Sequence, residues 1–180
     1  VFETILVKNK IPKNINEHIK RLQKGCKSIK IKPPSIELIQ SNLKKAISKH
    51  SNCILKIYVT RGSNTQGYLF QKNLTHSIYF RAMPITPSIT KITGLNLKVS
   101  SIILYPNAYS HGIKHMNRLD QSLAAFELLN NQLYDDMLLV DENKNIIETI
   151  SSNIFFVKKI RSQFYFYTPK MDKIGVEGIM

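Results

Sequence analysis

The stretch 112–121 (GIKHMNRLDQ) places one lysine between an irregular segment and the start of an amphipathic helix. Residues 117–133 carry apolar side chains at helical spacing, so the sequence predicts a helix there. A lysine amine is a nucleophile only when it is neutral, and its ordinary pKa is about 10.4. A buried, electropositive setting lowers that value, and Arg118 lies one helical turn away. Taken alone, this pattern favours an ordinary surface lysine over a nucleophile.

A second stretch, 148–155 (ETISSNIF), has the composition of a strand end, a turn and a further strand. Glu148 lies in a predicted strand at residues 146–149, small polar side chains follow, and apolar residues resume at Ile154. By itself this pattern indicates a hairpin. In combination with a nucleophilic lysine, it indicates an acid placed at the ring of a cofactor.

The remaining apolar patterns predict further strands and helices. Apolar spacings of three and four residues indicate helices, and alternation or β-branched runs indicate strands. Ser35 directly precedes one of these helices and is its expected N-cap. The predicted strands are 1–7, 53–60, 76–81, 95–104, 137–140, 146–149, 154–157 and 164–167, and the predicted helices are 15–29, 36–47 and 117–133.

The composition changes near the middle of the chain. Of the 26 Lys and Arg residues 16 lie in residues 1–83, with only 3 of the 12 acidic residues, so this part carries +13 of the total +14. Pro84, Pro87, Ser88 and Thr90 follow at the same point. The sequence therefore predicts two modules, 1–83 and 94–180, joined by a linker at 84–93. The expected fold class is α/β (α+β), with mixed or antiparallel sheets.

The overall composition is that of a soluble globular chain. Hydrophobic residues make up 43% of the 180 residues, and no run of about 18 apolar residues suggests a membrane span. Cys26 and Cys53 are too few for a disulfide framework, so buried thiols in a reducing compartment are expected. His111 and His115 are four apart, but Gly112 argues against a regular helix and no third ligand is evident, so no metal is expected.

The positive charge admits several interpretations. It is consistent with nucleic-acid or membrane binding, with an anionic substrate, or with a solvated basic face. The basic run at 20–32 has no Phe, Tyr or Trp among its lysines, so the stacking platforms of a nucleic-acid-binding protein are missing. No nucleic-acid or membrane partner is therefore expected, while a small anionic substrate and a solvated basic face both stay consistent with the charge.

Six stretches in chain order resemble the class IV aminotransferase family, and within it the 4-amino-4-deoxychorismate lyases. They are 2–4 (FET), 18–22 (HIKRL), 60–63 (TRGS) with 67–68 (GY), 112–121 (GIKHMNRLDQ), 148–155 (ETISSNIF) and 175–180 (GVEGIM). The resemblance implies the two-domain fold of the fold type IV pyridoxal-phosphate enzymes, like that of D-amino acid aminotransferase. It also implies a homodimer and a longer chain, of which the C-terminal domain is incomplete here.

The resemblance implies pyridoxal 5'-phosphate as the cofactor. Lys114 would link to its aldehyde and later act as a free base, and Glu148 would hold a proton on the pyridine nitrogen. Arg21 would bind the phosphate with its planar guanidinium. The other residues assigned to the cofactor are Ser152 and Asn153 in the turn beneath it, and Ile179 and Met180 through backbone N–H groups at a helix start. A structural role suits Asn153 equally well.

The substrate side of the resemblance depends on two residues. Thr4 stands where the lyases carry a threonine hydroxyl and the branched-chain aminotransferases carry glycine, so Thr4 would bind substrate or relay a proton. Arg61 lies where relatives place an arginine for a substrate carboxylate, although an arginine at a strand end is commonly just solvated. His115 and Arg118 are expected either to orient the lysine segment or to pack against it.

The expected function is that of a lyase which converts 4-amino-4-deoxychorismate to 4-aminobenzoate and pyruvate in cytoplasmic folate synthesis. The alternative is an aminotransferase on the same scaffold, acting on D-amino or branched-chain amino acids. Thr4 and the stretch 115–118 (HMNR) favour the lyase. A relative that keeps the fold without the activity is a third interpretation.

Overall fold

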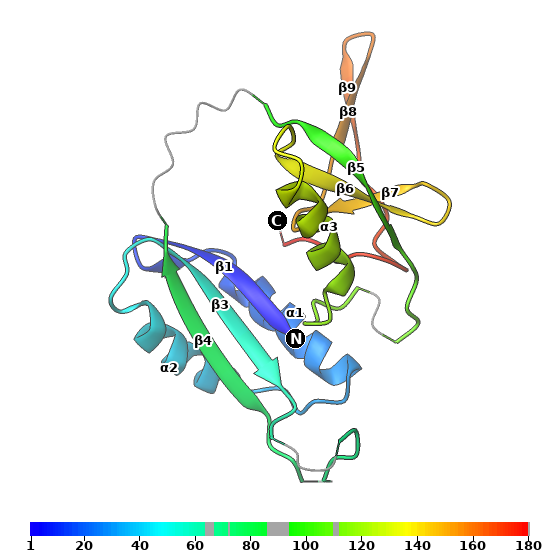
Figure 1. Ribbon diagram of the computed structural model, residues 1–180. Coiled ribbons are helices and arrows are strands. Elements are labelled where there is room, and N and C mark those ends of the chain that lie inside the picture. The colour runs from blue at the N-terminus through cyan, green and yellow to red at the C-terminus, as the bar shows by residue number, and fades with distance from the viewer. Residues whose placement is uncertain (64–66, 72, 86–93, 110–111, 180) are drawn as a thin grey trace. The chain divides into compact units, whose positions relative to one another are not determined.

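A computed structural model describes residues 1–63, 67–71, 73–85, 94–109 and 112–179 (Figure 1). The chain folds into two compact units. The first comprises Val1–Ser88, Lys114–Met116 and Ile179–Met180, and the second comprises Ile89–Ile113 and Asn117–Gly178. Of the linker predicted at 84–93, Pro84 ends a strand, and residues 86–93 lie outside the described residues. The lysine segment thus belongs to the first unit, although the chain on both sides of it belongs to the second.

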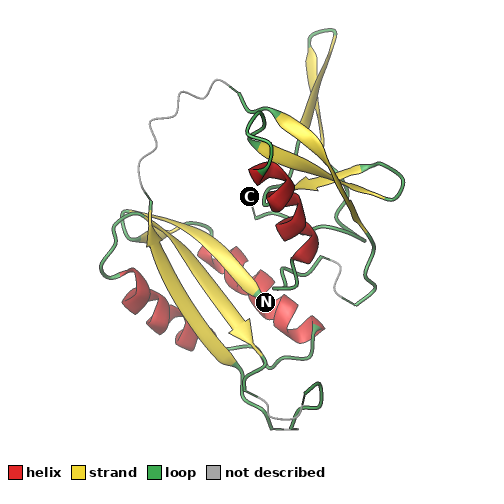
Figure 2. Ribbon diagram, viewed as in Figure 1, coloured by secondary structure: helices red, strands yellow, loops and turns green. Residues whose placement is uncertain are grey.

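The first unit is an antiparallel sheet with two helices. Its strands lie in the order β2-β1-β3-β4. The elements are β1 (Phe2–Lys8), β2 (Ile11–Pro12), α1 (Ile15–Ser28), α2 (Ile36–Ile47), β3 (Cys53–Thr60) and β4 (Ser77–Pro84). Figure 2 shows the long strands β1, β3 and β4 side by side in this unit.

Alternation along β1 and β3 decides which face of this sheet is buried. Ile5 and Val7 pair in register with Leu55 and Cys53, and all four side chains are fully buried. The residues between them point to the opposite face and are half-buried. Helices α1 and α2 contact these strands through apolar stripes. The buried stripe residues are Ile19, Leu22 and Cys26 on α1 and Ile39, Leu43 and Ile47 on α2.

The second unit combines a mixed sheet, one helix and a separate hairpin. β5 (Leu97–Leu104) runs parallel to β6 (Asp136–Asp141), and β6 pairs antiparallel with β7 (Ile146–Thr149). Helix α3 (Leu119–Leu129) packs on this sheet around a small core of Leu104, Ala124, Leu139 and Ile147. The hairpin consists of β8 (Phe156–Ile160) and β9 (Gln163–Tyr167), and every side chain in it is exposed.

The fold class predicted from the sequence is confirmed, and the ends of the elements shift by a few residues. Ser35 accepts the Leu38 N–H at 3.2 Å, which confirms the predicted N-cap of α2. Helix α3 is shorter than the predicted 117–133. It stops before Asn130 and Asn131, whose side chains compete for backbone hydrogen bonds and favour helix ends. Strand β4 extends beyond the predicted residue 81 because its whole length pairs with β3.

The structure also bears on the two cysteines and on the search for a membrane-spanning helix. Cys26 and Cys53 are buried free thiols, as predicted, and burial raises the pKa of Cys26. None of the helices in the described part of the chain has both the length and the apolar character that a membrane span requires.

Candidate functional site

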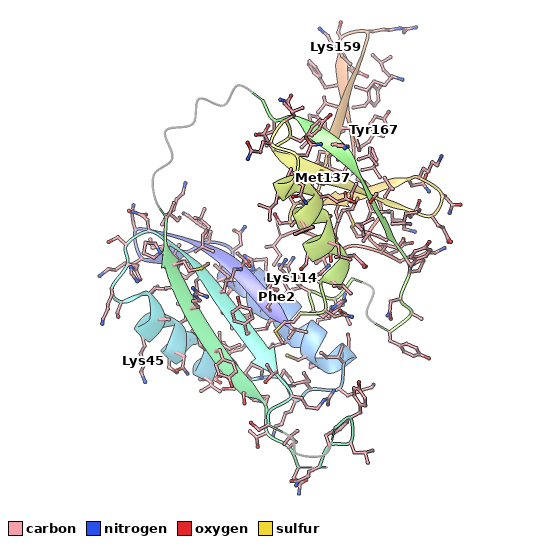
Figure 3. All side chains as sticks on the ribbon, viewed as in Figure 1. Phe2, Lys45, Lys114, Met137, Lys159 and Tyr167 are labelled. Atoms are coloured by element: carbon pink, nitrogen blue, oxygen red, sulfur yellow. The ribbon has the colours of Figure 1, made fainter. Side chains whose placement is uncertain are left out.

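Lys114 is anchored to the first strand of the sheet. The backbone N–H of Phe2 donates to the backbone carbonyl of Lys114 at 2.9 Å. The Lys114 Nζ lies 4.7 Å from the centroid of the Phe2 ring, and the lysine is half-buried (Figure 3). A protonated amine is attracted to the face of an aromatic ring. Phe2 therefore holds both the backbone and the amine of this lysine beside β1.

Thr4 lies on the same face of β1 as Phe2. Successive side chains of a strand alternate between faces, so Phe2 and Thr4 point one way and Glu3 the other. Burial agrees with this alternation, since Phe2 and Thr4 are half-buried whereas Glu3 is only 1% exposed. The amine and the hydroxyl named by the sequence are thus carried on one face of the sheet.

Glu3, His18 and Arg21 form a buried polar cluster on the opposite face. Glu3 Oε2 lies 2.7 Å from His18 Nδ1. Arg21 donates through Nε to Glu3 Oε1 at 2.8 Å and through Nη2 to Glu3 Oε2 at 2.6 Å. Burial by itself raises the pKa of Glu3, but hydrogen bonds and positive charge from Arg21 and His18 outweigh it and hold this pKa below its usual value. A carboxylate thus fixes the guanidinium that the sequence assigned to a phosphate.

This cluster predicts a loss of stability in acid. Because the pKa of Glu3 is lower in the folded chain, its contribution to the free energy of unfolding is complete above the ordinary value of 4.5 and is lost as the pH falls through the folded-state pKa. We expect Glu3→Gln to lower the free energy of unfolding by about 2–3 kcal/mol at neutral pH, because a largely buried guanidinium loses its carboxylate. Urea unfolding over a pH series checks this, and a difference that persists unchanged in acid contradicts it.

Arg61 directly follows β3 and contacts the end of α1. Its Nη2 donates to the Ile29 carbonyl at 2.6 Å and its Nη1 to the Lys30 carbonyl at 2.7 Å. The guanidinium carbon lies 4.2 Å from the centroid of the Phe70 ring. Carbonyls at a helix C-terminus attract cations, so these contacts cap α1. Arg61 also lines a cavity of about 450 Å³ with Lys30 and Lys32. The substrate-carboxylate role of Arg61 stays a prediction.

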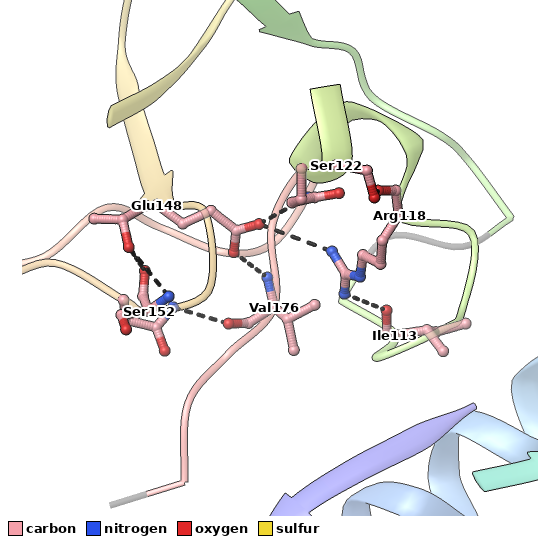
Figure 4. A network of polar contacts seen from close by, with 9 residues as sticks. Ile113, Arg118, Ser122, Glu148, Ser152 and Val176 are labelled. Atoms are coloured by element: carbon pink, nitrogen blue, oxygen red, sulfur yellow. Dashed lines mark hydrogen bonds and ion pairs between the residues drawn. The ribbon is translucent and has the colours of Figure 1, made fainter. Parts of the chain in front are cut away.

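Glu148, in β7, carries a buried carboxylate that is held by two hydrogen bonds and one ion pair. Its Oε1 accepts from Gln121 Nε2 at 3.1 Å, and its Oε2 accepts from the Val176 N–H at 3.1 Å (Figure 4). Arg118 Nη1 lies 3.8 Å from Oε1. Both hydrogen-bond partners donate and the guanidinium is positively charged, which suits an ionised carboxylate. The acid that the sequence placed at a strand end is therefore a buried and oriented anion.

Arg118 links this carboxylate to the residue before the lysine. Its Nη2 donates to the Ile113 carbonyl at 3.4 Å while its Nη1 faces Glu148 (Figure 4). Of the two roles left open for Arg118, these contacts fit the orientation of the chain that leads into Lys114. The contacts of Arg118 and Gln121 with Glu148 were not predicted from the sequence. The available signal was their spacing of three, with Arg118 at the N-cap of α3 and Gln121 in its first turn.

Two glycines allow the chain near residues 175–178 to approach this carboxylate and Asn153. Gly175 has φ +82°, and a Cβ there would lie 2.5 Å from Met171 Sδ and 3.2 Å from Glu148 Oε2. A Cβ on Gly178 would collide with Asn153 Oδ1. Asn153 Nδ2 donates to the Val176 carbonyl at 2.9 Å. In the structure Asn153 thus fastens this segment to the rest of the unit, while its predicted cofactor contact stays a prediction.

Gly175→Ala is expected to lower the free energy of unfolding by about 1–3 kcal/mol, because a left-handed backbone is strained with a Cβ and the new atom crowds Met171. It should also weaken cofactor binding, because Glu148 must shift. The measurements are urea unfolding and a titration with pyridoxal 5'-phosphate. Gly94→Ala is the matched control, since φ is +98° and a Cβ there meets nothing within 4 Å. Equal losses of cofactor affinity in both variants would show that the loss does not come from the crowding of Glu148.

The other residues predicted to contact the cofactor lie in the turn after β7 and at the end of the chain. The Thr149 N–H donates to the Ser152 carbonyl at 2.9 Å, and the Ser152 N–H donates to Thr149 Oγ1 at 3.2 Å, so the backbone of Ser152 closes the turn. Its side chain is exposed. Ile179 follows Gly178 in a non-helical segment, and Met180 lies outside the described residues.

The groups of each unit fit the cofactor that the sequence resemblance implies. Pyridoxal 5'-phosphate carries an aldehyde, a pyridine nitrogen and a phosphate, which suit an amine, a carboxylate and a guanidinium. The first unit supplies the half-buried amine of Lys114 and the guanidinium of Arg21. The second supplies the buried anion of Glu148. Within the described ranges, no group of three or more His, Cys, Asp or Glu is placed to hold a metal ion.

Comparison with known proteins places these features in a family. The sequence model described as amino-transferase class IV matches residues 1–180. An aminodeoxychorismate lyase of Vibrio harveyi is 26% identical over 181 residues, which cover 99% of this chain and 65% of that protein. The 4-amino-4-deoxychorismate lyase structure from Pseudomonas aeruginosa matches with a TM-score of 0.85 at 24% identity, over 98% of this chain and 64% of the other. The branched-chain amino acid aminotransferase of Escherichia coli matches with a TM-score of 0.85 at 22% identity, over 99% and 61%.

The matches cover nearly all of this chain but only part of each relative. The chain spans 65% of the length of the curated relative. The structural similarity runs over nearly all of the chain and confirms the predicted fold, that of the fold type IV enzymes. Because the family model matches from the first residue to the last, the chain belongs to the class IV aminotransferase family.

Proposed function

We propose that the full-length protein is a pyridoxal-phosphate-dependent lyase, which acts as a cytoplasmic homodimer and converts 4-amino-4-deoxychorismate to 4-aminobenzoate and pyruvate. The observation that carries this proposal is that the Lys114 amine lies over the ring of Phe2, whose side chain shares one face of β1 with that of Thr4. An amine and a hydroxyl on one face suit a reaction that removes one proton and delivers another. The name of the 26% identical relative, aminodeoxychorismate lyase, supports the same reaction.

The chain's own groups would divide the work of this reaction. When bound, the cofactor supplies an electron sink. The Lys114 Nζ takes the proton from the amine-bearing ring carbon, the C–O bond to the enolpyruvyl group breaks, and the ring becomes aromatic. The Thr4 hydroxyl relays a proton to the methylene carbon of the leaving enolpyruvate, which becomes pyruvate. Glu148 holds a proton at the pyridine nitrogen, and Arg21 holds the phosphate.

The charge of the chain is consistent with this substrate. 4-Amino-4-deoxychorismate carries two carboxylates, and residues 1–83 carry +13 of the net charge. A field of this sign raises the local concentration of anions and speeds their encounter with a site. The expected result is a KM that rises with ionic strength.

An aminotransferase that acts on D-amino or branched-chain amino acids is the second candidate, and the structural similarity is consistent with it. The branched-chain amino acid aminotransferase of Escherichia coli matches this chain with the same TM-score, 0.85, as the lyase of Pseudomonas aeruginosa. The scaffold therefore suits both reactions equally. The choice between them depends on side chains at the site, and the hydroxyl of Thr4 is the one that favours the lyase.

The test is a product assay on the full-length protein loaded with the cofactor. With 4-amino-4-deoxychorismate we expect 4-aminobenzoate and pyruvate in equal amounts. A parallel incubation supplies D-amino or branched-chain amino acids with 2-oxoglutarate, and we expect no glutamate. Glutamate formation without release of aminobenzoate would overturn the lyase and support the aminotransferase.

A further inference from the structure

We propose that Glu3 is a positioning residue, which holds the guanidinium of Arg21 in the orientation that binds the cofactor phosphate. This inference rests on the proposed function, since it takes Arg21 as the phosphate contact. Glu3 itself lies on the core face of β1 and is 1% exposed, so it acts through Arg21 and not on the ligand directly.

The geometry of the pair fixes the orientation of the guanidinium. Glu3 receives two parallel hydrogen bonds, from Nε at 2.8 Å and from Nη2 at 2.6 Å. A guanidinium is planar and has five N–H groups in a rigid fork. Because both bonds lie along the edge that carries Nε and Nη2, they allow the guanidinium plane only one orientation. The edge that carries Nη1 is therefore turned away from Glu3 in a defined direction.

His18 fixes the carboxylate in turn. Its Nδ1 lies 2.7 Å from Glu3 Oε2, the same oxygen that Arg21 Nη2 contacts. His18 and Arg21 are three residues apart and share one face of α1. An arginine that is already ordered in the folded protein loses less side-chain freedom when it binds a ligand. The cluster thus preorganises Arg21 before the cofactor arrives.

Packing alone does not explain an acid at this position. Glu3 alternates with Ile5 and Val7 along the core face of β1, where an apolar side chain would pack without removing a charge from water. A buried ion pair contributes little net stability compared with well-packed apolar residues. The strand also connects the functional groups, because Phe2 binds the Lys114 carbonyl, Glu3 binds Arg21, and Thr4 presents its hydroxyl.

The test compares two ligands that differ only in the phosphate, pyridoxal 5'-phosphate and pyridoxal. Affinities are measured on the full-length protein from the visible absorbance of the lysine-bound ligand, without any assay of activity. We expect Glu3→Gln to weaken binding of the phosphorylated ligand by about five- to tenfold and to leave pyridoxal within about twofold. Glu17→Gln removes the same charge from an exposed position on α1 and should change neither affinity.

A double variant tests whether Glu3 acts through Arg21. Arg21→Ala should weaken binding of the phosphorylated ligand, and adding Glu3→Gln should weaken it no further. Equal losses for both ligands, no loss for either, or additive losses in the double variant would each overturn the role given to Glu3. If Glu3→Gln does not fold, Glu3→Asp is measured by the same criteria. A wild-type protein that binds neither ligand would instead refute the proposed function itself.

Discussion

Replacing Lys114 with alanine is expected to abolish the visible absorbance of the bound cofactor and to lower lyase turnover by about 10³-fold or more. The Lys114 amine lies over Phe2 at 4.7 Å, and the backbone of Lys114 is hydrogen-bonded to the same strand. In the proposed reaction this one amine first anchors the cofactor and then removes the substrate proton. Its loss therefore removes two functions at once, which is why we expect the largest effect of any single substitution here.

The measurement is an absorbance spectrum, supported by borohydride reduction and mass spectrometry of the labelled peptide. Lys45→Ala is the matched control, because Lys45 is an exposed lysine on α2 of the same unit (Figure 3). The control should keep both the absorbance and the turnover of the wild type. A Lys114→Ala protein that still carries the covalent label would show that another lysine binds the cofactor.

Much of the fold could be predicted because the apolar residues of each helix or strand repeat at a regular spacing within that element. Ile5 and Val7 on β1, and Leu55 on β3, stand at alternate positions, so the strands and their core faces follow from sequence alone. The stretches that contain Lys114 and Glu148 could also be found, since each combines a distinctive residue with a recognisable turn or helix start.

The contacts that orient these residues could not be predicted in the same way, because they join separate elements. Glu148 meets Gln121 from α3 and Val176 from the chain after β9, and no local pattern pairs residues that are 27 or 28 positions apart. Glu3 is an instructive case. Its alternation with Ile5 places it on the core face, and a buried acid requires a cationic partner. The sequence therefore held a signal for the cluster with Arg21, although it did not identify the partner.

Glu148→Gln is expected to lower lyase turnover by about 10²–10³-fold while the protein still folds and binds the cofactor. The amide has nearly the size of the carboxylate, and its oxygen can still accept a hydrogen bond from Gln121 or from the Val176 N–H. A neutral amide cannot hold a proton on the pyridine nitrogen as an anion does, so the electron sink is weakened and cofactor binding is retained. Turnover per bound cofactor, from aminobenzoate release and absorbance, is the measurement.

Two substitutions together distinguish the effect of the charge of the Glu148 carboxylate from the effect of its position. Gly175→Ala moves a charged Glu148, whereas Glu148→Gln keeps the position and removes the charge. We therefore expect the first to weaken cofactor affinity and the second to slow the chemical step. Glu142→Gln, in the exposed turn after β6, removes a carboxylate from the same unit and should change neither property. Normal turnover in Glu148→Gln would mean that the ring nitrogen needs no anion from this chain, and Glu148 would then serve only to order Arg118 and Gln121.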